Sequence, residues 1–214
     1  DTEIYEIDNS VSKPVFENIL NLKQPVFFMF ENDYMYNINY DFLNNVLENE
    51  EIELHNCNDN DNYFFREKYS NLIKLKNTNE KYISENNYEL LSRTKIVKYL
   101  NNCDGSLIPP MVTNRQYDIV LGTKESYTNL KTELNFRNFI LVNHGKIELI
   151  LIAPKYKDVI NTTFDNDNFI EYTTMTPFNS NNKNVFENIE FKRVMLNTGN
   201  MMYIPVHWYY SIKY

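Results

Sequence analysis

The last part of the chain, residues 198–214, constrains the fold most. It opens with a glycine–asparagine pair at 199–200, and these residue types tolerate the positive φ angles of a tight turn. The apolar run 201–204 then predicts a strand. Pro205 ends that strand, because proline cannot donate to a sheet ladder, and the aromatic run 208–212 predicts another. We therefore predict a turn and two strands separated by a proline.

The second half of the chain, from about Gln116 onward, carries short strand patterns separated by turn residues. We predict strands over 118–121, 139–142, 147–152, 169–174, 185–195, 201–204 and 208–212. This half shows no alternation of strands with helices and no internal repeat. Short strands with turn signals between them favour a sandwich or a barrel.

The first half has helical patterns with a few strands between them. Ser12 and Pro14 mark the start of a helix, as its N-cap and a first-turn residue. We predict helices over 12–22, 41–48 and most of 63–102, and strands over 24–30 and 51–55. With 214 residues the chain fits one domain. We predict a single domain, 1–214, in which a helical N-terminal part, 1–115, packs on a β-barrel core, 116–214.

The composition limits the kind of partner. The net charge is −8 and no stripe of lysine or arginine offsets it, so nucleic-acid binding is disfavoured and a protein partner is expected. No apolar run has the length of a membrane span, so we expect no membrane association. Cys57 and Cys103 have no metal or redox spacing and are expected to stay reduced. We therefore expect an intracellular protein, cytoplasmic or nuclear.

The C-terminal segment resembles the closing segment of the Jumonji C (JmjC) family of iron- and 2-oxoglutarate-dependent oxygenases. In that family a Gly-Asp turn, a short apolar run, Ile-Pro and Trp-aromatic-His follow one another. Gly199, Ile204, Pro205 and Trp208 stand in the same order here. The resemblance covers roughly residues 14–214.

Three turn positions extend the resemblance. The chain has only four glycines, and Gly122, Gly145 and Gly199 each fall where the JmjC pattern places a turn. The strand after Gly145 ends at Pro154, as the corresponding strand does in the family. The resemblance implies a mainly β fold with N-terminal helices, in which a double-stranded β-helix forms a cupin-like jelly-roll barrel.

The resemblance also implies an Fe(II) site held by two histidines and one carboxylate. Two of these ligands come as His-x-Asp/Glu, and none of the three histidines here is followed in that way. The resemblance places Lys131, Glu133 and Tyr210 at the ligand positions. A shift of one residue would place Thr132 and Leu134 there instead. We therefore expect no catalytic residue and no bound metal, and take Lys131, Glu133 and Tyr210 as vestigial metal-site positions.

The resemblance places two residues at the 2-oxoglutarate site. Thr128 stands where the family often binds the cosubstrate carboxylate. The lysine that pairs with that carboxylate in many members corresponds to Ile147, with Lys146 adjacent. Neighbouring strand residues face opposite ways, so Lys146 could serve only if a bulge intervened. We expect no cofactor, or Fe(II) and 2-oxoglutarate if the chain is an active oxygenase.

A charged cluster is predicted at the former metal position. Lys131 and Glu133 lie two residues apart, so a strand turns both to one face. A buried carboxylate without a metal needs another positive charge, which Lys131 supplies. We expect both side chains to point inward toward Tyr210. The alternative is a solvent-exposed ion pair that adds little stability.

Three functions are compatible with these residues. The first is a non-catalytic pseudo-oxygenase that acts as a binding or structural module. The others are an active 2-oxoglutarate-dependent protein hydroxylase or demethylase with atypical ligands, and a cupin-type protein that binds a small molecule. Because the sequence stops four residues after Tyr210, where the family has a further strand, we also expect a barrel edge open to a homodimer contact.

Overall fold

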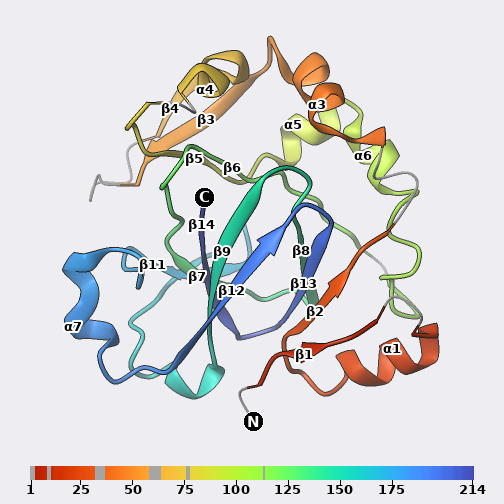
Figure 1. The fold of residues 1–214 in the computed structure, drawn as a ribbon, viewed down its shortest axis with the longest axis vertical. Helices are drawn as coiled ribbons and strands as arrows, with labels where there is room; N and C mark the ends of the chain where they lie inside the picture. Colours follow the sequence, from red (N-terminus) through yellow and green to blue (C-terminus); the bar gives the residue numbers. More distant parts are fainter. Residues whose placement is uncertain (1–2, 9–10, 32–36, 58–63, 76–77, 113) are drawn as a thin grey trace. The chain divides into compact units, whose positions relative to one another are not determined.

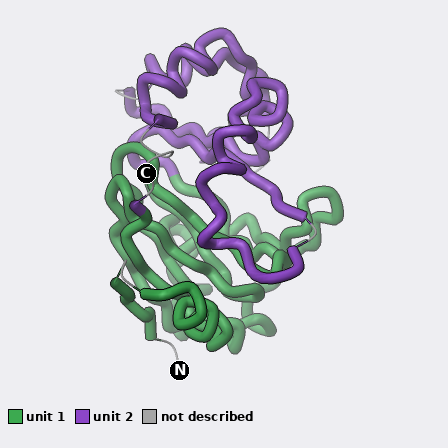
Figure 2. Tube along the Cα trace, turned by 90° about the vertical axis from the view of Figure 1, so that its right-hand side faces the viewer, with its two compact units in different colours: residues 1–30, 127–214 green, residues 31–126 purple. Residues whose placement is uncertain are grey.

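The computed structural model describes residues 3–8, 11–31, 37–57, 64–75, 78–112 and 114–214 (Figure 1). In these ranges the chain is mainly β, with strands β1 to β14 in three sheets and six helices. The predicted mainly β class is confirmed. The chain forms two compact units (Figure 2), which we call unit 1 (residues 1–30 and 127–214) and unit 2 (residues 31–126).

Unit 1 holds two of the sheets. The four-stranded sheet has the order β1 (Tyr5–Glu6), β2 (Val26–Met29), β13 (Asn200–Pro205) and β8 (Arg137–Leu141). The six-stranded sheet has the order β10 (Thr163–Asp165), β11 (Ile170–Thr173), β7 (Leu130–Glu133), β14 (Tyr209–Lys213), β9 (Lys146–Ile152) and β12 (Phe191–Asn197). Neighbouring strands are antiparallel except β1 and β2. Neither sheet closes into a barrel among the described strands, so the predicted barrel is not seen as a closed structure.

The main core of unit 1 lies between these two sheets. Met202 and Ile204 of β13 share one buried cluster with Leu149 and Leu151 of β9 and with Tyr210 of β14. The cluster therefore takes side chains from both sheets, which requires the sheets to pack face to face. Alternate residues of each strand point into this core, and the residues between them point to the outer faces.

A helix covers the outer face of the four-stranded sheet. This helix, α1 (Lys13–Leu20), has Ser12 as N-cap and a proline in its first turn, as predicted. Phe16 packs edge-on against Phe28 of β2, with ring centroids 5.3 Å apart. The Tyr203 hydroxyl of β13 donates to the Leu20 carbonyl oxygen at 3.3 Å. These contacts place the apolar side of α1 against β2 and β13.

A long excursion between β9 and β12 covers the outer face of the six-stranded sheet. It contains η1 (Pro154–Tyr156), β10, β11, η2 (Ser180–Asn182) and α7 (Lys183–Phe186). Its Ile160, Phe186 and Ile189 form a buried cluster with Leu130 of β7 and Tyr209 of β14. The six-stranded sheet is therefore buried on both faces at its centre.

Unit 2 combines the third sheet with four helices. The sheet has the order β4 (Phe64–Lys68), β3 (Glu51–Asn56), β5 (Tyr82–Ser84) and β6 (Leu121–Gly122). The helices are α3 (Tyr40–Leu47), α4 (Tyr69–Leu75), α5 (Tyr88–Arg93) and α6 (Ile96–Leu100). Their core includes Leu47, Leu54 and Leu91, each at most 1% exposed. In the described part of the chain, none of the helices is long and apolar enough to cross a membrane.

Several predicted elements need correction. The helical prediction for 63–102 is wrong at β4 and β5, and residues 63 and 76–77 of that range lie outside the described residues. The first part of predicted strand 185–195 belongs to α7, and of 118–121 only Leu121 lies in a strand. The reason is tertiary pairing: β5 and β6 are short and gain their partners from distant sequence, which local patterns do not reveal.

Of the three glycines predicted to lie in turns, two do so and one does not. Gly145 and Gly199 have φ angles of +83° and +88°, in the turns that join β8 to β9 and β12 to β13. These are the left-handed values that favour glycine. Gly122 is different, because it pairs with Ile83 in the β5–β6 ladder and does not make the predicted turn.

Candidate functional site

The three residues predicted to be vestigial metal-site positions come together on neighbouring strands. Tyr210 of β14 lies directly opposite Lys131 of β7, so the two side chains are on one face of the sheet. Glu133, two residues after Lys131, is on that face as well. Because Tyr210 belongs to the cluster between the two sheets, this is the core side of the six-stranded sheet. We call Lys131, Glu133 and Tyr210 the inner triad.

A short hydrogen bond links two members of the inner triad. The Tyr210 hydroxyl donates to Glu133 Oε1 at 2.5 Å, and Asn135 Nδ2 donates to the other carboxylate oxygen at 3.4 Å. The Lys131 ammonium nitrogen is 5.7 Å from the centre of the Tyr210 ring, within the range of a cation–π contact. Lys131 is 7% exposed and Tyr210 4%. Glu133 is half-buried, so the inner triad is a partly buried cluster at the edge of the core.

The alternation of β7 turns Thr132 away from Tyr210. Thr132 pairs with Glu171 of β11, on the face opposite the inner triad. Leu134 follows β7, and its backbone N–H bonds to the Phe169 carbonyl oxygen at 3.0 Å. The inward positions are therefore Lys131 and Glu133, as predicted.

Thr128 has a structural partner for its hydroxyl. Its Oγ1 accepts a hydrogen bond from the Ile212 N–H at 2.9 Å, and its own N–H donates to the Ile212 carbonyl oxygen at 2.8 Å. The Ser211 hydroxyl donates to the Thr128 carbonyl oxygen at 2.7 Å. Thr128 is fully buried and ties the chain before β7 to β14.

Lys146 does not face the inner triad. The β9–β12 ladder runs without a bulge from the pair Lys146–Asn197 to the pair Ile152–Phe191. Ile147 is buried in the same cluster as Tyr210, so its neighbour Lys146 points to the opposite side, where it is exposed. Thr128 and Lys146 are thus not brought together with the inner triad.

A second polar cluster lies on the outer face of the same strands, and the sequence did not reveal it. Glu171 accepts hydrogen bonds from Lys157 Nζ at 2.9 Å and from the Tyr209 hydroxyl at 3.3 Å. Burial favours the neutral acid, but the Lys157 hydrogen bond and charge outweigh it, so the pKa of Glu171 lies below its ordinary value. Burial, with the nearby Glu171 charge, raises the pKa of Tyr209 to about 12.

The position of Thr132 between two strands shows how the outer cluster of Lys157, Glu171 and Tyr209 is arranged. It lies on the middle strand, β7, with Glu171 opposite on β11. The Tyr210–Lys131 pairing sets Tyr209 opposite Thr132 on the other side. The Tyr209–Glu171 hydrogen bond therefore passes over Thr132, which is 1% exposed. Its Oγ1 is buried and has no hydrogen-bond partner among the described residues.

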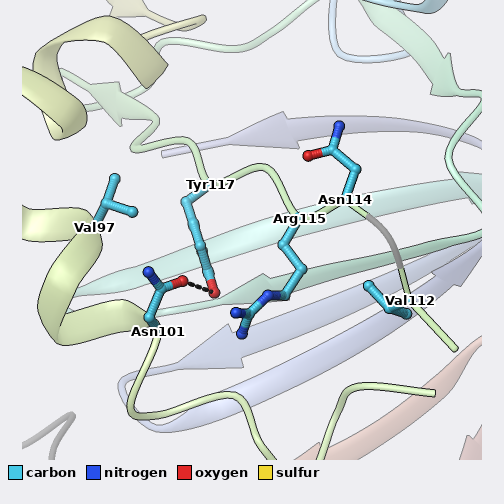
Figure 3. A pocket seen from close by; sticks show the side chains of 6 residues that line it. All are labelled: Val97, Asn101, Val112, Asn114, Arg115 and Tyr117. Carbon is cyan, nitrogen blue, oxygen red and sulfur yellow. Dashed lines mark hydrogen bonds between the residues drawn. The ribbon is translucent and has the colours of Figure 1, made fainter. Parts of the chain in front are cut away.

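Unit 2 carries a pocket of about 330 Å³ (Figure 3). Its lining residues come from α6 and from the segment that follows the next turn: Val97, Asn101, Val112, Asn114, Arg115 and Tyr117. Arg115 Nη1 donates to both carboxylate oxygens of Asp104, at 3.0 and 3.1 Å. The Tyr117 hydroxyl contacts Asp104 as well, and lies 2.9 Å from Asn101 Oδ1.

Burial and the Asp104 charge raise the pKa values of two side chains that line this pocket. Burial, together with the hydrogen bond to Asp104, raises the pKa of Tyr117 well above its ordinary value. The Asp104 carboxylate also raises the pKa of Arg115. Both side chains therefore keep their protons at neutral pH. No motif predicted this pocket, because its residues are ordinary surface types at irregular spacing.

The histidines are spread over three separate places. His55 is buried on β3 and packs edge-on against Phe64 at 5.0 Å. His144 lies in the β8–β9 turn, and His207 is exposed with a φ of +70° between β13 and β14. Within the described ranges, no group of three or more His, Cys, Asp or Glu side chains is placed to hold a metal ion.

No protein-family model matches the sequence, and no curated protein matches it.

Proposed function

We propose that this chain is a degenerate relative of the JmjC oxygenases, a pseudo-oxygenase that serves as a binding or structural module. The observation that carries the proposal is the partly buried hydrogen bond from Tyr210 to Glu133, with Lys131 beside the Tyr210 ring. The resemblance assigns these same three positions to the iron ligands. An ammonium group has no lone pair to give to a metal. A protonated phenol is a much weaker metal ligand than a neutral imidazole.

The charge balance supports loss of a metal. A carboxylate at a buried position costs several kcal/mol unless a positive group is close. A divalent ion supplies that charge in an oxygenase. In this chain Lys131 supplies a positive charge near the Tyr210 ring, and the Tyr210 hydroxyl donates a short hydrogen bond to Glu133. Together they replace the metal ion as partners of the carboxylate. The substitutions are thus mutually consistent, as expected if the position is retained for stability.

The strand connections support the proposed double-stranded β-helix. The chain passes from β7 in the six-stranded sheet to β8 in the four-stranded sheet and back to β9. It repeats this path through β12, β13 and β14. The two runs interleave, because β14 lies between β7 and β9, and β13 pairs with β8. Two runs wound around one core in this way are typical of a jelly roll.

A metal and turnover assay tests the proposal. The purified chain is titrated with Mn(II) and followed by electron paramagnetic resonance, and is incubated with Fe(II) and 2-oxoglutarate to measure succinate. We expect no change in the spectrum of free Mn(II) and no succinate above the protein-free blank. Succinate formation that disappears in a Glu133→Ala variant would overturn the proposal.

A gain-of-binding variant serves as the matched control. Lys131→His with Tyr210→His, beside the native Glu133, completes a two-histidine, one-carboxylate set. If the three positions correspond to the iron ligands, this double variant should bind Mn(II) while the Lys131→His single variant should not. Circular dichroism confirms that each variant is folded. A folded double variant without Mn(II) binding would refute the correspondence.

As a module, the chain needs a partner. The net charge of −8 favours a basic polypeptide and opposes nucleic acid. We therefore propose a protein partner of basic character.

A further inference from the structure

We propose that the pocket of unit 2 is a binding site for a carboxylate group joined to an apolar body. The site is formed by Val97, Asn101, Val112, Arg115 and Tyr117, and shares no residue with the inner triad. It therefore stands independently of the proposed oxygenase ancestry.

Asp104 holds the pocket in a fixed form. Its carboxylate accepts two hydrogen bonds from Arg115 Nη1 and a further one from the Tyr117 hydroxyl. Only 14% of the Asp104 side chain is exposed, against 37% for Arg115. An anchored guanidinium loses less conformational entropy on binding a ligand than a free one, so the site is organised in advance.

The guanidinium keeps donors for a ligand. Both bonds to Asp104 use Nη1, and Tyr117 is a second hydrogen-bonding neighbour of the guanidinium, so part of its five N–H groups is left for a ligand. Nε–H and one Nη2–H form a parallel pair, the arrangement that binds the two oxygens of a carboxylate. Figure 3 shows the Arg115 side chain reaching from its loop to lie beside Tyr117.

Asn101 adds a further polar group. The Tyr117 hydroxyl lies 2.9 Å from Asn101 Oδ1, so it is the amide oxygen of Asn101 that faces Tyr117 (Figure 3). The NH₂ group of Asn101 takes no part in that contact, and it is the donor that this side chain can offer to a ligand oxygen.

The charges select a singly charged anion. Arg115 is the one cation of the lining, and Asp104 already neutralises much of its charge. A phosphate, with nearly two negative charges, would meet Asp104 and a chain of net charge −8. A carboxylate meets less repulsion and matches the planar guanidinium edge. Val97 and Val112 add an apolar wall, which favours a hydrocarbon body beside the carboxylate.

Two sources could present this chemistry: a free branched-chain acid, or the C-terminal residue of a polypeptide. The experiment therefore uses 4-methylpentanoate for the first and N-acetyl-leucine for the second. Each is added to the full ¹⁵N-labelled chain and followed by changes in backbone amide shifts. The uncharged 4-methylpentanamide and N-acetyl-leucinamide are the matched controls.

We expect saturable shifts at the residues that line the pocket with the acids and none with the amides. Equal affinity of the two acids assigns the site to free acids, and tighter binding of N-acetyl-leucine assigns it to a peptide end. Absence of saturable shifts with both acids at millimolar concentration overturns the proposal. Shifts centred elsewhere, or equal binding of acids and amides, overturn it too.

Variants identify the contact group. Arg115→Gln removes the guanidinium and should weaken acid binding about tenfold or more, the usual effect of losing a charge-assisted hydrogen-bond pair. Asn101→Asp leaves Arg115 in place and adds a negative charge, and should weaken binding as well. Arg66→Gln, an exposed arginine of the same unit, should have no effect. Unchanged affinity in a folded Arg115→Gln variant would overturn the assignment.

Discussion

The Tyr210 hydroxyl donates a hydrogen bond of 2.5 Å to Glu133 on the neighbouring strand, in a partly buried position on the inner face of the six-stranded sheet. The bond joins a phenol to a carboxylate where the resemblance to oxygenases assigns two iron ligands. The Glu133 carboxylate therefore has a side-chain hydroxyl as its hydrogen-bond donor at this position. The stability of this contact can be measured without knowledge of any partner.

Tyr210→Phe removes only the hydroxyl and leaves the ring in place. The carboxylate of Glu133 then loses its main donor, so we expect the free energy of unfolding to fall by about 1–3 kcal/mol. Urea denaturation followed by circular dichroism measures the change. Tyr88→Phe, on a residue that is 39% exposed, is the control and should change stability by less than about 0.5 kcal/mol. A loss equal to the control would show that the hydrogen bond adds nothing.

Lys131 and Glu133 should be energetically coupled through the same site. Lys131→Ala leaves the partly buried Glu133 carboxylate without its nearby cation, and Glu133→Ala leaves Lys131 without its nearby anion. Each change should lower the free energy of unfolding by about 3–5 kcal/mol. The double variant should cost less than the two single variants added together. Denaturation of all four proteins forms the cycle. Strict additivity would mean that the two charges do not interact.

The outer cluster of Lys157, Glu171 and Tyr209 should make the free energy of unfolding depend on pH in the acidic range. Folding lowers the pKa of Glu171, so its ionised form stabilises the fold above the unfolded pKa. This stabilisation is lost as the pH falls through the folded pKa, below the ordinary value of 4.5. The free energy of unfolding should therefore drop more steeply in the wild type than in Glu171→Gln when the pH is lowered from about 5 to 3. Glu187→Gln, on an exposed residue, should keep the wild-type slope.

Two glycines give a test of the turns that order the sheets. Gly145 has a φ of +83° and no atom near the position of an added Cβ, so Gly145→Ala probes backbone strain alone. We expect it to cost about 1–2 kcal/mol. Gly105→Ala also meets no atom within 4 Å and lacks the left-handed φ, so it should be nearly neutral. Equal effects in thermal or urea unfolding would contradict the assigned turn.

Much of unit 1 could be predicted from local patterns. The strands around Ile204 and Tyr210 have a turn before them, a proline between them and strong alternation, so their positions follow from the sequence. The inner triad followed from the spacing of Lys131 and Glu133, once a family pattern had set Tyr210 beside them. Alternation alone then fixes which side chains share a face.

The parts that escaped prediction depend on contacts between distant residues. β5 gains its pairing from His55 on one side and Gly122 on the other, and no local pattern indicates either. The outer cluster joins Lys157, Glu171 and Tyr209 through strand order, which the sequence does not state. The unit 2 pocket likewise depends on how Asp104 orients Arg115.

The division of the chain has a consequence for its synthesis. Unit 2 is one continuous stretch, 31–126, whereas unit 1 must join residues near its start to strands near residue 200. Met29 of β2 pairs with Asn200 of β13, and the Phe30 N–H bonds to the Gly199 carbonyl oxygen at 2.9 Å. Such long-range pairings form slowly. During synthesis β2 leaves the ribosome long before β13 is made, so we expect β2 to stay without this neighbour while residues 31–126 are completed.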